Sequence, residues 1–142
     1  MDGETPNGWY STEFYLFDLS TGEFDLISQS VNAPERVDAS LAIDALGETV
    51  YLYGGWDGNQ WHNDLWAMDL VERGWYQVLA DKPVGWGPPP GAGSALLAEA
   101  TNGRLTVMTT TNGGGDNEAI WRLDLLGEAR WVPSAELETV EQ

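Results

Sequence analysis

Hydrophobic and polar positions alternate in short runs along this chain, with turn residues between the runs. Residues 49–53 are rich in β-branched and aromatic side chains, and residues 39–43 alternate, with larger apolar side chains at 41 and 43 and small ones between them. A period of two predicts half-buried strands. Helical periodicity is absent except at residues 135–140, which predict either one short helix or a disordered acidic tail. The pattern therefore predicts an all-β chain of short antiparallel strands.

One sequence motif occurs three times, and it divides these strands into repeats. An aromatic residue stands three positions before an Asp-Leu pair, and a second aromatic follows the Asp by six or seven positions. The three copies are Tyr15, Asp18 and Phe24; Trp66, Asp69 and Trp75; and Trp121, Asp124 and Trp131. The Asp residues lie 51 and 55 positions apart, which is close to the length of a four-stranded propeller blade. Repeats of this length predict stacked units that need neighbours to bury their faces.

The middle and third repeats each predict four strands, whereas the first predicts only an outer pair. The expected strands are 14–19 and 23–27; then 39–43, 49–53, 65–70 and 75–79; then 94–98, 104–109, 119–125 and 130–132. A polar loop is expected at residues 56–63 and a glycine-rich loop at residues 111–116. The chain thus divides into a half blade (1–33), a full blade (34–82), a degenerate full blade (83–134) and an acidic tail (135–142).

The middle unit resembles a kelch repeat. Its second strand ends at Gly54 and Gly55, its third carries Trp66 and Asp69, and Trp75 opens its fourth. Residues 34–36, Pro-Glu-Arg, match a Pro-x-Arg pattern often found before the first strand of such repeats. The third unit departs from the family pattern at two places, with threonines at 109 and 110 and Gly-Ala-Gly at 91–93. The resemblance implies a kelch-like β-propeller segment, and many kelch propellers are protein-interaction platforms.

The repeated aromatic residues are expected to be structural. Broad rings on adjacent strands supply large apolar contacts between stacked sheets, so we expect Trp66, Trp75, Trp121 and Trp131 to pack between blades. Two and a half blades cannot close a ring of four to eight. We therefore expect the chain to complete its ring with copies of itself or with another propeller-like chain, a symmetric dimer giving five or six blades. The alternative is a structural fragment of a longer propeller.

Composition narrows the possible partners. The chain has 23 acidic and 6 basic residues, a formal net charge of −17, so nucleic acid and anionic membranes are excluded as expected partners. No run of about 18 apolar residues predicts a membrane span, and the N-terminus lacks the pattern of a signal peptide. The sequence thus predicts a soluble chain and assigns it no compartment.

The sequence gives little support for a catalytic function. The chain has no cysteine, and His62 is its only histidine, so a two-histidine relay or a metal centre built on several histidines is impossible. Galactose oxidase, a copper enzyme on a kelch-type propeller, needs a Tyr-Cys crosslink and histidine ligands that this chain lacks. The glycine run 113–115 is not followed by the lysine of a phosphate loop, and no acidic spacing singles out a glycosidase pair. We predict no enzyme activity and no cofactor.

The surface loops are the better functional candidates. Loops after the second and fourth strands of a blade emerge on one side, where aromatic and polar side chains suit a protein epitope or a sugar ring. The candidate binding face comprises Trp56, Asp57, Asn59, Trp61, His62, Trp86, Asp116 and Asn117. Trp56 and Trp86 have the alternative of folding over the blade edges. The acidic loops predict local turns, with a weak calcium site at Asp57, Asn59 and Asp64 as the alternative.

Overall fold

The computed structural model describes residues 13–28, 34–44, 48–83, 85–91, 94–99, 103–109, 120–126 and 129–133. In these ranges all regular structure is β-strand, and within each sheet every strand pairs antiparallel with the strand next to it. The all-β prediction is therefore confirmed, and the alternating pattern is its cause. None of the described residues forms a helix that is long and apolar enough to cross a membrane.

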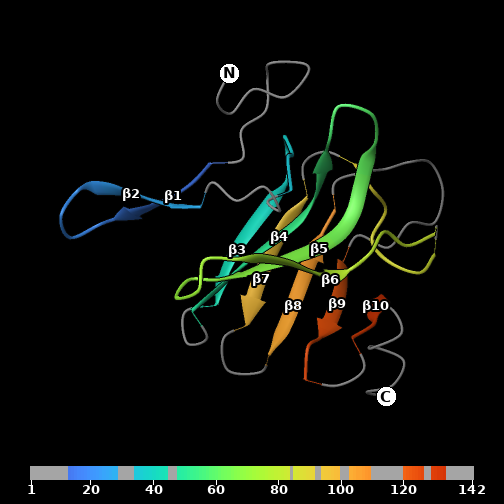
Figure 1. Ribbon diagram of the computed structural model, residues 1–142. Coiled ribbons are helices and arrows are strands. Elements are labelled where there is room, and N and C mark those ends of the chain that lie inside the picture. The colour runs from blue at the N-terminus through green and yellow to red at the C-terminus, as the bar shows by residue number, and fades with distance from the viewer. Residues whose placement is uncertain are drawn as a thin grey trace.

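The described strands form three sheets (Figure 1). The half blade contains β1 (Phe14–Asp18) and β2 (Glu23–Ser28). The first blade contains β3 (Ser40–Asp44), β4 (Thr49–Trp56), β5 (Trp61–Asp69) and β6 (Trp75–Leu79), in that spatial order. The second blade contains β7 (Ala95–Glu99), β8 (Arg104–Met108), β9 (Ile120–Asp124) and β10 (Trp131–Pro133). Figure 1 shows the half blade extending away from the two stacked four-stranded sheets.

The repeated Asp closes the turn between the two outer strands of each unit. One carboxylate oxygen of Asp18, Asp69 and Asp124 accepts a hydrogen bond from the backbone amide two positions further on, at 2.7, 2.7 and 3.0 Å. Asp and Asn side chains form such local turns readily. The Asp-Leu motif therefore indicates a turn together with the apolar strand that precedes it.

The predicted polar loop at 56–63 is wrong, because β4 continues to Trp56 and β5 begins at Trp61. These two residues lie opposite each other, with ring centroids 5.3 Å apart. Asp57 Oδ1 accepts hydrogen bonds from the backbone amides of Asn59 and Gln60, which closes the turn in four residues. A cross-strand aromatic pair and a side-chain-closed turn thus lengthen this hairpin.

The glycine doublet at the end of β4 has a steric cause. Gly54 and Gly55 both have positive φ, 66° and 94°. A Cβ at Gly55 would lie 2.8 Å from the carbonyl oxygen of Val37, whose backbone pairs with Trp56. Only glycine fits both the left-handed conformation and this close approach of the preceding segment.

The main core lies between the two blades. Its buried members come from both sheets: Tyr51, Tyr53, Leu65, Ala67, Leu96, Leu105, Val107, Trp121, Leu123 and Trp131. Tyr53 and Trp131 meet edge to face, with ring centroids 5.8 Å apart. Strands β3 and β7 lie side by side at the inner end of the stack, where the Ser40 hydroxyl donates to the Ser94 carbonyl.

A smaller core joins the half blade to the first blade. Ile27 packs against Met68 and Trp75, and the ring centroids of Phe14 and Trp75 are 4.7 Å apart. An ion pair between Arg73 and Asp25, 3.2 Å long and exposed, is a further contact. The half blade is therefore anchored at its base, while the rest of the hairpin projects into solvent.

Candidate functional site

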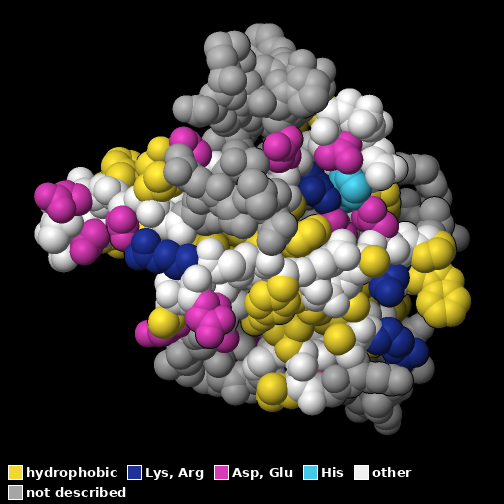
Figure 2. All heavy atoms as spheres, viewed as in Figure 1, with side chains coloured by type: hydrophobic (Ala, Val, Ile, Leu, Met, Phe, Trp, Pro, Cys, Tyr) yellow, Lys and Arg dark blue, Asp and Glu magenta, His cyan; other side chains and the backbone are white. Residues whose placement is uncertain are grey.

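His62 is the centre of a hydrogen-bond network at the end of the β4–β5 hairpin. Its Nδ1 lies 2.7 Å from Asp81 Oδ2, and its Nε2 lies 2.7 Å from Asp57 Oδ2. Ionised carboxylates only accept hydrogen bonds, so both contacts are hydrogen bonds when the ring is protonated and each of its nitrogens donates. His62 is only 8% exposed, and Figure 2 shows the visible part of the histidine between acidic and basic side chains.

The protonation of this network follows from its hydrogen bonds. Burial lowers the pKa of His62, but the hydrogen bonds to Asp57 and Asp81 outweigh burial and leave that pKa raised. The hydrogen bond from His62, with those of two backbone amides, holds the pKa of Asp57 well below its usual value. Charge-assisted hydrogen bonds of this kind are stronger than neutral ones. The network is therefore a charged clasp, here named the His62 clasp (Asp57, His62 and Asp81).

A buried ion pair lies beneath the His62 clasp. Asp64 Oδ2 accepts hydrogen bonds from Arg36 Nη2 at 2.6 Å and from Trp66 Nε1 at 2.8 Å. Both charged side chains are almost fully buried. Burial raises the pKa of Asp64 in spite of these two bonds. This pair joins the segment before β3 to β5. Removing either partner would leave an uncompensated buried charge.

Asn63 attaches the segment that follows β6 to the same hairpin. This segment, here named the strap, comprises residues 80–83 and 85–91. Asn63 Nδ2 donates to the carbonyl oxygens of Lys82 and Pro88, at 3.1 and 2.9 Å, and its Oδ1 accepts from the Lys82 amide. The Asn63 backbone amide also donates to Asp81 Oδ1 at 2.8 Å. Asn63 therefore holds the strap at two places, at Asp81 and Lys82 near its start and at Pro88 further along.

His62, Asp64 and Asp81 are the group that could hold a metal ion among the described residues, since their candidate ligand atoms all lie within 4.8 Å of one another. His62 and Asp81 already bond each other. Asp64 is paired with Arg36, and Asp64 Oδ1 and Arg36 Nε are both buried without a hydrogen-bond partner. Arg36 thus supplies the positive charge that an ion would bring, and the geometry fits a hydrogen-bond network.

The calcium alternative drawn from the sequence names a different group, Asp57, Asn59 and Asp64. In the structure Asp57 uses one oxygen for its own turn and the other for His62. Asn59 is exposed in that turn, whereas Asp64 is buried on β5, where it pairs with Arg36. These three side chains therefore have separate local roles, which explain why oxygen-rich residues occur here.

The predicted binding-face residues lie on two described segments. Trp56, Asp57, Asn59, Trp61 and His62 share the end of the β4–β5 hairpin, where Trp56 is half-buried and Trp61 is exposed. Trp86 lies on the strap with 68% of its surface exposed. The last two members of the predicted face, at positions 116 and 117, lie outside the described residues.

Sequence reasoning missed Arg36, Asn63 and Asp81 as members of this site. The Pro-x-Arg pattern flagged Arg36 without a partner, and Asp64 is 28 positions away. Asp81 is 19 positions from His62 and belongs to the connection between two blades. Such pairs follow no strand or repeat period, so only the fold brings them together.

Two stacked, four-stranded antiparallel meanders with a half unit before them define the chain as a β-propeller segment. Residues 39–78 match the family model of the Kelch motif, so the first blade contains a kelch motif and the resemblance is confirmed there. The chain is also similar in structure to TolB from Acinetobacter baumannii, with 17% sequence identity and a TM-score of 0.55. That match covers 84% of this chain and 25% of TolB, and at this identity it concerns the fold alone.

Proposed function

We propose that this chain is a non-catalytic binding and assembly module. It is a kelch-like propeller segment whose stack is completed by association, with copies of itself or with a partner chain. Its loop face, at the end of the β4–β5 hairpin and along the strap, binds a protein. The half blade, full blade, degenerate blade and acidic tail set out from the sequence are the units of this module.

The observation that carries the proposal is the exposure of repeat positions that are buried in the complete blades. The residue before the repeated Asp is fully buried in the first and second blades, as Met68 and Leu123, but Phe17 in the half blade is 45% exposed. The aromatic that opens the last strand behaves alike, since Trp75 is 6% exposed and Phe24 is 71% exposed. An apolar sheet face of this kind is typical of an interaction surface.

The opposite end of the stack shows the same contrast. On the outer face of the second blade, Met108 and Ile120 are exposed. They occupy the register positions of Tyr53 and Leu65 in the first blade, which are buried between the blades. Both ends of the described stack thus carry apolar side chains where an interior blade has a neighbour, which supports completion by another chain.

The loop face supports protein binding for a different reason. The His62 clasp, the buried ion pair below it and the Asn63 contacts hold two loop segments in fixed positions. Two aromatic side chains, Trp61 and Trp86, remain exposed beside these polar groups. Rigid aromatic anchors with directional polar neighbours are typical of protein interfaces.

Absolute mass in solution tests the assembly half of the proposal. If copies of this chain complete the stack, light scattering over a range of protein concentration should give a multiple of 15.6 kDa, favoured by high salt because salt screens the net charge of −17. Phe24→Ser should weaken association, whereas Val71→Ser, at an equally exposed turn position, should leave the mass unchanged. A folded monomer under every condition would reject self-association and leave completion to a partner chain.

Carbohydrate binding through Trp56, Trp61 and Trp86 is the second candidate, favoured by the exposed ring of Trp86. Sugar stacking on this ring would quench tryptophan fluorescence, and Trp86→Ala would abolish the quenching. Fluorescence unchanged by mono- and oligosaccharides would reject this candidate.

A further inference from the structure

The innermost strand of the first blade is uncovered on the side of the half blade. Leu41 and Ile43 of β3 are 53% and 52% exposed there. Their register equivalents in the second blade are Leu96, which is 6% exposed, and the half-buried Ala98. The first blade covers those two with its own inner strands. Leu41 and Ile43 are exposed because the half blade contains no inner strands among its described residues.

The half blade also has an open edge next to this uncovered strand. β1 pairs with β2 along one edge, and no other described strand pairs with it. Its counterparts in the complete blades, β5 and β9, have a partner on each side. An open edge presents unpaired backbone amides and carbonyls, which is a template for another strand. The neighbours that the described half blade lacks correspond to the first two strands of a four-stranded unit.

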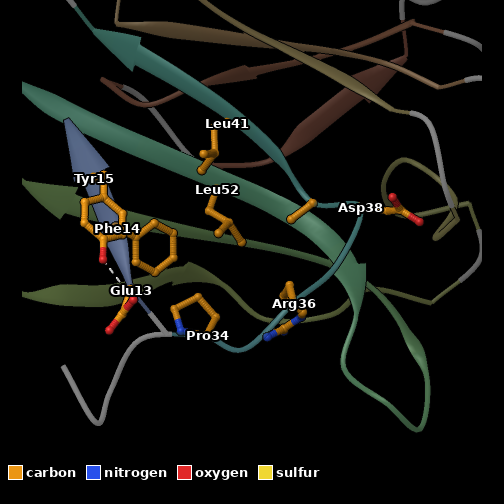
Figure 3. Close-up of a pocket in the computed structure, with 9 residues that line it drawn as sticks. Glu13, Phe14, Tyr15, Pro34, Arg36, Asp38, Leu41 and Leu52 are labelled. Carbon is orange, nitrogen blue, oxygen red and sulfur yellow. Dashed lines mark hydrogen bonds between the residues drawn. The ribbon is translucent and has the colours of Figure 1, made fainter. Parts of the chain in front are cut away.

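A groove lies between the open edge and β3. One part, about 230 Å³, is lined mainly by apolar side chains, including Leu16, Leu41 and Ile43. An adjoining part of about 320 Å³ has Glu13, Arg36 and Asp38 among its lining residues. Figure 3 shows Phe14 and Tyr15 of β1 on one side of this second part and Leu41 and Leu52 on the other.

The charge of the groove and the existing pairing of this chain's inner strands indicate which kind of chain occupies the groove. Arg36 is neutralised by its ion pair with Asp64, so Glu13 and Asp38 make the polar part of the groove acidic. A second copy, with a net charge of −17, is therefore a poor match for this rim. Its described inner strand pairs, β3–β4 and β7–β8, are also already used in their own blades.

We infer that the groove accepts a pair of antiparallel strands from a partner chain with neutral or basic outward side chains. One strand hydrogen-bonds to the open edge of β1, and the second covers Leu41 and Ile43, as β3 covers β7 within this chain. This mode of binding is β-augmentation, in which the backbone gives affinity and alternate side chains give specificity. The inference rests on the proposed function and names the surface and partner chemistry for it.

A synthetic strand pair tests this inference. The probe is a labelled peptide with the sequence of residues 39–56, carrying Asp44→Lys and Glu48→Lys to suit the acidic rim. We expect it to bind the full chain, to slow hydrogen exchange of the β1 amides at least tenfold, and to bind more tightly than the unsubstituted peptide. Leu41→Asn in the protein should weaken binding about tenfold, because roughly half a leucine side chain then loses its apolar contact.

The matched control is Leu97→Asn, which changes a leucine of equal exposure, 51%, at the other end of the stack. It should leave peptide binding unchanged. Absence of binding at millimolar peptide, binding without protection of β1, or equal loss in both variants would overturn the inference. A light-scattering mass above 15.6 kDa with no peptide binding would retain the proposed assembly and reject this groove. Peptide binding by a monomer would retain the groove and reject self-association.

Discussion

Truncating the equivalent apolar side chain in each unit tests whether a neighbouring sheet covers that unit's face. Leu123→Ala removes three buried carbon atoms from the core between the two blades, where Leu123 is fully buried. At about 0.8 kcal/mol for each, plus a cavity contribution of about 1 kcal/mol, the free energy of unfolding should fall by about 3 kcal/mol. Met68→Ala, in the smaller core, should have an effect of similar size.

Phe17→Ala is the matched change on the half blade. Phe17 is 45% exposed, and its main ring contact is Phe24, with centroids 4.7 Å apart. The half-buried ring, whose burial includes the contact with Phe24, amounts to about 1 kcal/mol. We therefore expect a difference of about 2 kcal/mol between Phe17→Ala and Leu123→Ala.

Urea unfolding followed by tryptophan fluorescence would measure these differences, at a concentration where light scattering shows a monomer. With a slope of about 2 kcal/mol/M, Leu123→Ala should lower the midpoint by roughly 1.5 M and Phe17→Ala by roughly 0.5 M. Equal losses for Phe17 and Leu123 would mean that the half-blade face is covered in the isolated chain. A loss below about 1 kcal/mol for Leu123→Ala would refute the packing of the two blades.

Three further changes test the site and the glycine doublet. The raised pKa of His62, the only histidine, means that its imidazolium contributes full stability below its unfolded pKa near 6.5 and loses that contribution as pH rises through the folded pKa. Urea midpoints between about pH 6 and 9 should therefore fall in the parent protein relative to His62→Gln, and parallel curves would contradict the clasp. Arg36→Met should lower the free energy of unfolding by about 3–5 kcal/mol, because it leaves Asp64 charged and buried; thermal unfolding with little change in midpoint would contradict the ion pair. Gly55→Ala should lower the same quantity by about 3 kcal/mol, because its Cβ would meet the Val37 carbonyl, whereas Gly74→Ala, with open space around it, should change it by less than about 0.5 kcal/mol in denaturant titrations.

Much of the fold could be predicted because the repeat is itself a structural unit. Alternating side chains identify the strands, and the motif around Asp69 identifies both a buried strand and the turn after it. The error at residues 56–63 has a physical cause. Asn63 and Asp64 are polar, which predicts exposure, yet both are buried with hydrogen-bond partners on other segments.

Less of the site could be predicted. His62 stood out because it is the only histidine, but nothing in the spacing of the chain points from it to Asp81. The clasp depends on the strap returning over β5, which is a property of the connection between blades. The loop residues at 116 and 117 lie outside the described structure, and their part in the binding face stays a prediction.

The open half blade is the central claim, and hydrogen exchange of the isolated monomer tests it most directly. The account predicts that amides of β1 and β2 exchange much faster than those of β4, β5, β8 and β9, because one face of the hairpin and the outer edges of both its strands have no described neighbour. Protection of β1 and β2 equal to that of β4 and β5 in the monomer would show that the chain covers its own half blade, and would contradict the account.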